Sequence, residues 1–533
     1  MGREEILRQP IQQVQAASIR YIEGFEEAVR KAVAEGSKKV GRPIGEKIAG
    51  IGVDTTGSTP CPVNKEGIPL ALLPEFADNP NAMFWLWKDH TAIDEAKEIN
   101  RILSDFRGEN YTRFQGEYAS EWWWAKILHC ARTDSRVKEA AYSWIEHCDW
   151  IPALLTGRTK PEEMYRCSCA AGHKALWHSD FGGLPAHECL KAIDPYLEKV
   201  AETYGQGPQV STTNTGMITP EWAERLGISK KCIIGGSSLD AHAGAVGAGI
   251  TDNTLVMVIG TSAVDMLIEK RQNVRGKDLK DSCGMAENSI VPGYIGIESS
   301  QAAFGDVYSW IRDILMWSVR DFVDSMEGIS EEQKRQYTKD YKNRLLDRLS
   351  QEAMAYEGED ISAVDWLNGR RYPIINEKVK SGVYGLSLST DTVQLFRSFV
   401  LSTVFGARRI VESFVTRGIQ IDRIITVGGV SKRSPLIMQL LADALKRPIQ
   451  VSNCNQACAR GAAIYAAVAA GFYHTIVEAQ KTMCIGFSNV YTPNEDNFTR
   501  YDILYRKYLN VGRHFEDIQS SWDGEGAEKE YEQ

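Results

Sequence analysis

The sequence predicts an α/β protein in which strands end in short turns of glycine, threonine and serine. Three apolar, strand-like runs finish in such turns, at residues 54–59, 260–262 and 428–431. In α/β proteins, ligands bind at the carboxyl ends of the strands, where such turns lie. The turns are of a size that cradles a phosphate, and they recur in both halves of the chain. We therefore expect a duplicated α/β architecture that binds a nucleotide.

The composition is that of an ordinary globular protein and excludes several classes of partner. The chain has 533 residues, enough for two or more domains, with 43% hydrophobic and 25% charged residues. Its net charge of −9 argues against a nucleic-acid-binding protein. The first residues are polar, unlike a secretion signal, and the longest uncharged apolar run, 462–472, is too short to cross a membrane. We expect a cytoplasmic protein with no membrane partner, whose eleven cysteines are reduced thiols.

Periodic apolar residues predict the main helices. Residues 22–33 have helical spacing, and Gly36 ends the pattern. Asp391 is the expected N-cap of a long helix that Gly418 ends. The other expected helices are 117–128, 144–155, 436–445 and 459–472, and the expected strands begin at 47, 232, 254 and 424. The acidic tail, 516–533, lacks periodicity and is expected to be disordered.

One carboxylate stands in the middle of the most distinctive stretch, residues 235–249. Asp240 follows an apolar run and two glycines, and only small residues follow it. An acid on a strand-to-helix turn can be a base that faces a substrate hydroxyl. It can equally be an N-cap that holds the first turn of the helix. The stretch by itself leaves both interpretations open.

Two further segments suit a pocket for a polyhydroxylated substrate. Residues 81–92 place aromatic side chains before a Lys-Asp-His cluster, which gives apolar walls and a few polar groups. The alternative for this segment is an aromatic strand that ends at a helix cap. Lys174 follows His173 in a turn-like stretch, where it either reaches a ligand or faces water. Cys167 and Cys169 lack a second pair of metal ligands, which disfavours a metal site.

Five segments together resemble the FGGY carbohydrate kinases of the actin/hexokinase/Hsp70 superfamily. They are Gly-Val-Asp-Thr-Thr-Gly-Ser-Thr-Pro (52–60), Leu-Trp-Lys-Asp-His-Thr-Ala (86–92), Ser-Glu-Trp-Trp-Trp-Ala-Lys-Ile-Leu-His (120–129), Ala-Gly-His-Lys-Ala-Leu-Trp-His (171–178) and Asp-Trp-Leu-Asn-Gly-Arg-Arg (365–371). The resemblance extends from about residue 20 to about residue 510. It is most specific for the members that phosphorylate L-ribulose in L-arabinose degradation.

The resemblance implies two ribonuclease-H-like domains around a central cleft, a sugar-binding domain at 1–247 and an ATP-binding domain at 248–515. It implies ATP as the phosphoryl donor, with Mg²⁺ held partly by water and by carboxylates that the motifs do not assign. The acceptor would be L-ribulose or a related pentulose or pentitol. A homodimer is left open.

The resemblance also assigns roles to individual residues. Asp240 matches the catalytic carboxylate of the family, a general base for the sugar hydroxyl. The expected substrate-binding residues are Cys61, Lys88, Asp89, Lys174 and Glu298. The expected ATP-binding residues are Gly260, Thr261 and Ser262, which resemble the second phosphate loop, and Gly428, Gly429 and Ser434, which resemble the adenosine motif. Ser434 stands where relatives often carry Asn.

One family feature is missing from its expected place. The family opens with a strand hairpin whose Asp-x-Gly-Thr/Ser loop is the first phosphate motif, and no such loop precedes the first predicted helix. The Asp54-Thr-Thr-Gly segment aligns with a later strand and is no substitute. Loss of even one donor at a reacting centre costs about 2.7–4 kcal/mol. We therefore expect an incomplete N-terminal sheet with an exposed edge, and either a truncated kinase or a homologue that binds sugar and nucleotide without turnover.

Overall fold

The chain forms two compact units, each assembled from segments that are far apart in the sequence. The computed structural model describes residues 15–522 apart from 17, 276, 278, 280–283, 374, 377 and 485. The first unit contains residues up to 252, 268–297 and 456–485, and the second contains 253–267, 298–455 and the chain from 486 onward. The sequence predicted two contiguous domains, 1–247 and 248–515, whereas each of the two units consists of several separate segments.

The first unit contains most of the short elements. Its helices are α1 (Ser18–Val40), α2 (Ile93–Leu103), α3 (Trp123–Thr133), α4 (Ser135–Ala140), α5 (His147–Thr156), α6 (Ser168–Ala175), α7 (His187–Ile193), α8 (Pro195–Glu202), α9 (Pro220–Leu226), α10 (Asp240–Ala248), α11 (Arg271–Val274), α17 (Ala457–Ala469) and α18 (Ile476–Met483). Its strands are β1 (Gln15–Ala16), β2 (Gly50–Thr55), β3 (Pro60–Val63), β4 (Phe84–Trp85), β5 (Ser143–Glu146), β6 (Asn214–Met217), β7 (Ile233–Leu239) and β10 (Gly284–Glu287).

A three-stranded sheet in the order β2-β7-β6 holds the centre of the first unit. Strands β2 and β7 are parallel, with Asp54 opposite Ser238 and Thr55 opposite Leu239, whereas β6 is antiparallel to β7. Within the described residues β2 pairs on one side only, and a cavity of about 770 Å³, lined by α1, β2 and α17, lies beside it. Because β2 and β7 are parallel, Asp54 and Asp240 lie at the same end of the sheet.

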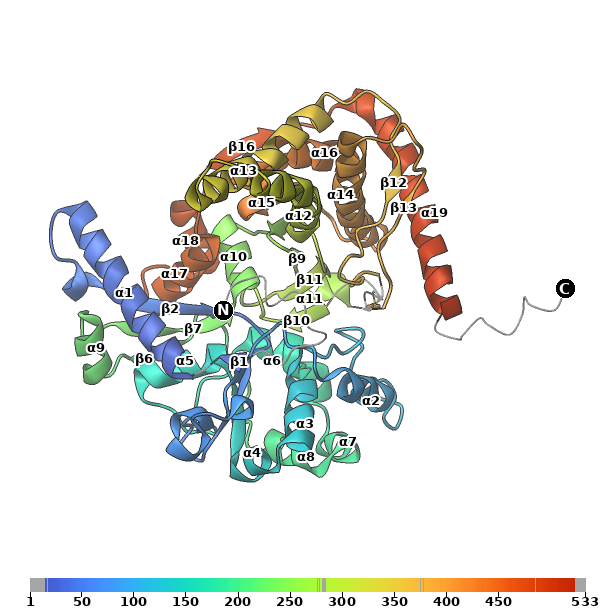
Figure 1. Ribbon diagram of the computed structural model, residues 1–533. Helices are drawn as coiled ribbons and strands as arrows, with labels where there is room; N and C mark the ends of the chain where they lie inside the picture. Colours follow the sequence, from blue (N-terminus) through green and yellow to red (C-terminus); the bar gives the residue numbers. More distant parts are fainter. Residues whose placement is uncertain are drawn as a thin grey trace. The chain divides into compact units, whose positions relative to one another are not determined.

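Helix α10 packs against α17 (Figure 1), and glycines lie at the contact. A Cβ atom on Gly247 would lie 1.9 Å from the carbonyl oxygen of Ala457, and one on Gly461 would lie 1.9 Å from that of Ala243. No larger residue fits at either position without moving a helix. This close contact holds α10, and therefore Asp240 at its start, in a defined position on the sheet.

Tryptophan side chains fill the largest core of the first unit. Trp123, Trp124 and Trp144 are all at most 1% exposed. The predicted helix at 117–128 begins only at Trp123, as α3. The predicted helix at 144–155 is instead strand β5 followed by α5, because Trp144 lies opposite Pro62 in an antiparallel pair of β5 with β3. The apolar run of a short buried strand has the same composition as that of a buried helix, so the pattern could not separate them.

The second unit combines long helices with a mixed sheet. Its helices are α12 (Gly305–Asp324), α13 (Glu331–Met354), α14 (Thr392–Thr416), α15 (Gly429–Arg433), α16 (Pro435–Leu445) and α19 (Phe498–Trp522). Its strands are β8 (Thr254–Ile259), β9 (Ala263–Glu269), β11 (Ile295–Gln301), β12 (Ser362–Ala363), β13 (Val383–Tyr384), β14 (Arg423–Val427), β15 (Ile449–Ser452) and β16 (Phe487–Tyr491), of which β9 and β11 cross its boundaries.

The main sheet of the second unit runs in the order β11-β9-β8-β14-β15-β16. Strands β8 and β9 are an antiparallel hairpin that closes at Ile259 and Ala263, so the predicted break at Gly260–Ser262 is confirmed. Strand β14 is parallel to β8, with Val427 opposite Val258. The Asp391 cap of α14 is also confirmed, because its Oδ1 accepts the N–H of Gln394 at 2.8 Å.

The C-terminal helix extends further than the sequence predicted. Helix α19 continues to Trp522, so residues 516–522 are helical and not part of a disordered tail, while 523–533 lie outside the described residues. Two contacts explain the difference: Glu516 forms an ion pair with Arg370, and the Phe515 ring covers Gly382. No helix in the described part of the chain combines the length and apolar character needed to cross a membrane.

Candidate active site

Asp240 is the first residue of α10, directly after β7. The N-cap position belongs to Leu239, which makes no side-chain cap bond, so Asp240 does not have the capping role considered for it. Its Oδ1 accepts the adjacent N–H of Ala241 at 2.7 Å. The carboxylate is therefore held locally and is half-buried at the carboxyl end of a central strand, which is where α/β proteins bind ligands.

The electrostatic surroundings of Asp240 suit a base. Burial raises the pKa of Asp240, while the Ala241 N–H and the positive potentials of His242 and Lys174 act in the opposite direction. A carboxylate with a raised pKa binds a proton more strongly than an exposed one, which favours general-base catalysis near neutral pH. Lys174, the residue expected to contact a sugar, is thus close enough to Asp240 to influence its charge.

Lys174 lies in the last turn of α6 and is buried. Its ammonium group stands over the Trp122 ring, 5.1 Å from the centroid, a cation–π arrangement. Its backbone carbonyl accepts the hydroxyl of Tyr118 at 2.5 Å, and that hydroxyl in turn accepts the N–H of Trp124 at 2.8 Å. Lys174 is therefore oriented by its aromatic surroundings and does not simply face water.

A second carboxylate, which the sequence did not identify as a site residue, lies near Asp240. Burial and the negative charge of Asp240 raise the pKa of Asp54 to about 6. Two carboxylates at the ends of adjacent parallel strands influence each other's charge, and one of them then holds its proton to higher pH. The sequence contained the signal, an Asp at the end of a predicted strand, but the neighbouring strand could not be known before the topology.

Lys126 and Glu146 fix the turn that begins at Ser58. Lys126 is fully buried, and its Nζ donates to the carbonyls of Ser58 at 2.9 Å and Leu86 at 2.7 Å. Glu146 accepts the Ser58 hydroxyl and, at 2.7 Å, the N–H of Thr59. Burial lowers the pKa of Lys126 to about 8, partly offset by the negative charges of Glu146 and Asp89. One lysine thus ties the Ser58 turn to residues 81–92, a segment from which a sugar pocket was predicted.

The other residues expected to bind the substrate have different surroundings. Cys61 is completely buried in a core that includes Val53 and Phe84. Asp89 is also buried, and its Oδ1 accepts the N–H and the hydroxyl of Thr91 at 3.0 and 2.6 Å. Lys88 is half-exposed beside it. Phe84 and Trp85 form β4 and belong to the core, as in the alternative interpretation of this segment as a strand.

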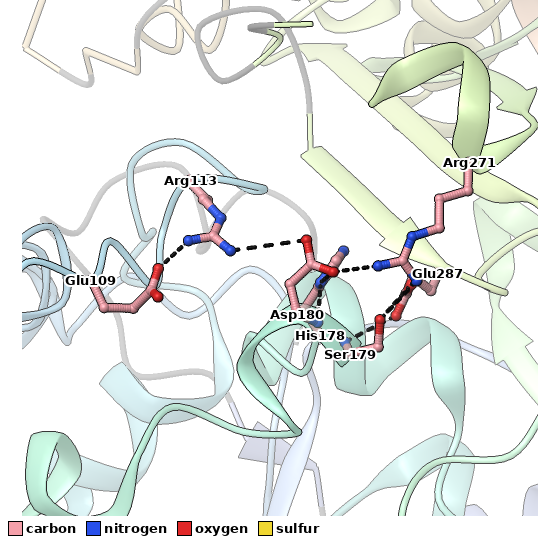
Figure 2. Close-up of polar contacts among 7 residues, drawn as sticks. All are labelled: Glu109, Arg113, His178, Ser179, Asp180, Arg271 and Glu287. Atoms are coloured by element: carbon pink, nitrogen blue, oxygen red, sulfur yellow. Dashed lines mark hydrogen bonds and ion pairs between the residues drawn. The ribbon is translucent and has the colours of Figure 1, made fainter. Parts of the chain in front are cut away.

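A network of ion pairs fixes the loop that follows α6 (Figure 2). Arg271 donates to the Ser179 hydroxyl at 2.9 Å and pairs with Glu287 at 2.6 Å and with Asp180. Glu287 also accepts the N–H of Ser179 at 3.0 Å. Arg113 lies 3.9 Å from Asp180 on the other side. The network connects the end of the Lys174 helix to residues from α11 and β10.

In the second unit, all six predicted nucleotide residues come from segments around the ends of β8 and β14. The Gly260 N–H donates to Ser262 O at 2.9 Å and closes the hairpin. The N–H groups of Phe304 and Asp306 donate to Thr261 O at 2.8 and 3.1 Å. Because β8 and β14 are parallel neighbours, the Gly260–Ser262 turn and the Gly428–Gly429 turn lie at the same edge of the sheet. We refer to these two segments as the strand-end turns.

The Gly428–Gly429 turn packs against the last residue of β8, and this contact requires glycine. Gly428 has φ of 108°, and a Cβ atom there would lie 2.2 Å from the carbonyl oxygen of Ile259. Only glycine combines this conformation with this approach. Ser434 caps α16, with its hydroxyl accepting the N–H of Ile437 at 3.4 Å, a structural role that does not exclude the nucleotide contact predicted for it. Glu298 lies on β11, in the second unit.

Comparison of the sequence with known proteins identifies the family of the chain. Residues 255–470 match the C-terminal domain of the FGGY family of carbohydrate kinases. A ribulokinase of Vibrio parahaemolyticus is 40% identical over 504 residues, which are 93% of this chain and 87% of that protein. The chain belongs to the FGGY family of carbohydrate kinases. A ribulokinase of Geobacillus thermodenitrificans is 33% identical over 88% of this chain and 80% of its own length.

Solved structures agree with the family at the level of the fold. A xylulose kinase from Brucella ovis superposes with a TM-score of 0.75 at 16% identity, covering 96% of this chain and 92% of that one. A glycerol kinase from Plasmodium falciparum, solved with ADP, gives 0.70 at 14% identity and covers 94% and 92%. The resemblance to FGGY kinases inferred from the five sequence motifs is therefore confirmed, as are the α/β fold class of two ribonuclease-H-like domains and the assignment as a carbohydrate kinase.

In this FGGY kinase, the chemistry-bearing side chains of the first unit gather around one end of its sheet. We call Asp54, Lys126, Glu146, Lys174 and Asp240 the carboxylate–lysine group. Lys174 and Asp240 were predicted as site residues from the sequence, and their roles stay predictions. Asp54, Lys126 and Glu146 were not predicted, because their importance depends on neighbours that are distant in the sequence.

Proposed function

We propose that this FGGY kinase phosphorylates L-ribulose at its terminal hydroxyl with ATP, and that Asp240 is the general base. The substrate is supported by similarity to proteins named ribulokinase over most of their length. The observation that carries the mechanism is the place of Asp240, half-buried at the carboxyl end of β7 and under the electrostatic influence of Lys174.

In the proposed reaction, the Asp240 carboxylate accepts the proton of the sugar hydroxyl as that oxygen attacks the γ-phosphorus of ATP. A new P–O bond to the sugar forms, the bond between the γ-phosphorus and its bridging oxygen breaks, and ADP leaves. A general base of this kind contributes about 10²–10⁴-fold to the rate. Lys174 would orient the sugar through its ammonium group, which its aromatic surroundings hold in place.

The strand-end turns of the second unit are the proposed nucleotide site. Backbone N–H groups and hydroxyls at Gly260–Ser262 suit phosphate oxygens, and the Gly428–Gly429 turn lies at the same edge of the sheet, after the parallel strand β14. A bound Mg²⁺ would neutralise charge on the ATP phosphates. We also propose a cytoplasmic location, since the ten cysteines described by the structure are all free thiols.

The test is a coupled assay of ADP release with L-ribulose, comparing the wild type with Asp240→Asn. The exposed Asp94 gives a matched control, Asp94→Asn. We expect Asp240→Asn to lower kcat by about 10²–10⁴-fold, while calorimetry detects sugar binding in both variants. Equal kcat values in the wild type and in Asp240→Asn would contradict the assignment of Asp240 as the base.

The same assay separates the alternatives for substrate and activity. D-ribulose and ribitol in place of L-ribulose test whether a related pentulose or pentitol is preferred. Sugar and nucleotide binding with no ADP release from any of the three would indicate a homologue that binds without turnover.

A further inference from the structure

The second unit contains a cavity of about 380 Å³ that shares no residue with the strand-end turns. It lies between the C-terminal part of α14 and the middle of α19. Its volume is at the lower end of the range of small-molecule sites, about 300–1,000 Å³. The lining residues are Tyr372, Arg409, Glu412, Ser413, Thr416, Arg417, Tyr505, Leu509, Arg513 and Glu516.

The carboxylates of this cavity are already neutralised by arginines outside its lining. Glu412 accepts Nε of Arg408 at 2.7 Å, and Glu516 forms an ion pair with Arg370. The side chains of Arg408 and Arg370 are only 12% and 10% exposed, so they are fixed in these pairs. The positive charges of the lining are thus not balanced by its own two acidic residues.

Two of the lining arginines make no ion pair with any residue that the structure describes. Arg409 is half-buried and lies over the Tyr372 ring, 6.0 Å from its centroid. Arg513, at the rim, donates to the Asn510 side chain at 3.0 Å. Burial and the like charge of Arg409 lower the pKa of Arg370 to about 10. Asp365 and Glu516 balance part of this charge, and an anion bound beside Arg409 would relieve the remaining repulsion.

A purely structural role accounts for only part of this arrangement. Arginines at the end of a helix can stabilise its last carbonyl groups. Arg417 does so, since its Nη1 donates to the Ser413 hydroxyl at 2.8 Å and to Ser413 O at 3.4 Å. Neither Arg409 nor Arg513 donates to a backbone carbonyl within the described residues. Their guanidinium groups keep donors for a ligand.

We propose that this cavity binds a small phosphate monoester, of about the size of a sugar phosphate. Guanidinium groups match phosphate oxygens in two-point hydrogen bonds. The ring of Tyr372 and the side chain of Leu509 supply apolar walls, as small-molecule sites require. A small dicarboxylate has related charge, and the experiment separates the two.

The experiment is isothermal titration of the full chain, without ATP or sugar, with ribose 5-phosphate and with succinate. Four proteins are compared: wild type, Arg409→Gln, Arg513→Gln and, as a matched control, Arg506→Gln on the exposed side of α19. Ribose 5-phosphate should bind the wild type and the control alike, and about tenfold or more weakly to the other two. Its binding should also weaken from pH 7.5 to pH 5.5, because the second phosphate pKa is about 6.

Two results would overturn the proposal. One is ribose 5-phosphate binding that is absent at millimolar concentration or equal in all four proteins, which includes binding at the sugar site alone. The other is succinate binding as tightly as the phosphate ester. Arg513 lies at the exposed rim, so Arg513→Gln keeps the test decisive if Arg409→Gln unfolds. Because the variants leave Asp240 and the strand-end turns intact, the outcome is independent of the proposed kinase activity.

Discussion

The carboxylate–lysine group of the first unit and the strand-end turns of the second unit are built by opposite means. The former consists of side chains, with Lys126, Glu146 and Lys174 less than a tenth exposed. The turns consist of backbone, held by the hydrogen bonds of a hairpin and by the approach of Gly428 to β8. The first arrangement depends on charge in a poorly solvated place, and the second on conformation. They should therefore fail in different ways when altered.

Among the changes that test this comparison, the largest effect on stability is expected from Lys126→Met. This change removes the hydrogen bonds that hold the Ser58 and Leu86 carbonyls and leaves Lys174 as the remaining positive charge near Glu146. Breaking a buried charge arrangement typically costs about 3–5 kcal/mol of unfolding free energy. In the folded fraction we expect the sugar KM to rise by roughly tenfold with kcat nearly unchanged, because Lys126 bonds to backbone. Denaturant unfolding and steady-state kinetics measure both, with exposed Lys97→Met as the control.

The pH dependence of Lys126 sharpens that test. Its folded pKa, about 8, lies below the ordinary value of 10.5, so the folded protein releases this proton first. The cost of the buried charge is present below pH 8 and is lost as the pH rises from 8 to 10.5. Over the same range the wild-type sugar KM should rise, because a neutral amine holds the two carbonyls less firmly. A wild-type KM that is flat across pH 8–9.5 would contradict the role given to Lys126.

Gly428→Ala should have the next largest effect, which is expected on nucleotide binding and not on sugar binding. The Cβ atom of the alanine would lie 2.2 Å from Ile259 O and would have to displace it. The alanine would also have to adopt φ of 108°. Such strain costs roughly 1–3 kcal/mol. We expect the KM for ATP to rise about tenfold while calorimetry finds sugar affinity unchanged. Gly471→Ala is the control, since its φ is also positive and nothing lies within 4 Å of a Cβ there. A matching rise in the sugar KM would break the contrast between the two arrangements.

Asp54→Asn is expected to change the pH profile of kcat/KM more than it changes kcat. The pKa of Asp54, about 6, is raised from 3.8, so its burial cost is absent below pH 3.8 and complete above pH 6. The Asn variant should gain roughly 1–3 kcal/mol of stability relative to wild type at pH 7–8. Removing a negative charge near Asp240 should also move the acid limb of kcat/KM to lower pH. The exposed control Asp78→Asn should leave the acid limb in place. If Asp54→Asn leaves it in place too, the charge of Asp54 does not influence Asp240.

Arg271→Gln should have the smallest effect. Its side chain is 54% exposed, and ion pairs of this kind contribute about 0–1 kcal/mol. We expect less than a threefold change in the sugar KM and a loss of stability that disappears at high salt. A loss above about 1 kcal/mol would show that the loop after α6 depends on this network (Figure 2).

The same contrast explains which features could be predicted from the sequence. The strand-end turns are local, so glycine at 260 and at 428 after apolar runs predicted their position. The capping of α14 by Asp391 is local too and was predicted correctly. The helix expected at 144–155 is present from His147 onward, but its predicted start belongs to strand β5, because Trp144 pairs with β3, some eighty residues earlier. Local pattern carries no information about such a partner.

The carboxylate–lysine group shows the same limit at the level of the site. Asp240 was recognisable as a functional candidate, although the sequence by itself left open whether it is a cap or a base, and its role as a base stays a prediction. Lys126 looked like one residue of a tryptophan-rich helix, and Glu146 like part of another helix. Their contacts with the Ser58 turn span 68 and 88 residues. Only the assembled topology brings them together.

The first unit is built from separate segments of the chain, which has a consequence for how it folds during synthesis. Helix α17 belongs to that unit and fits α10 at the Gly247 and Gly461 contacts, yet it comes after nearly the whole second unit in the sequence. During synthesis, domains fold as their residues emerge, beginning at the N-terminus. Here the residues around Asp240 must wait for α17 before their support is complete. The emerging chain therefore exposes one face of α10 until α17 has been synthesised.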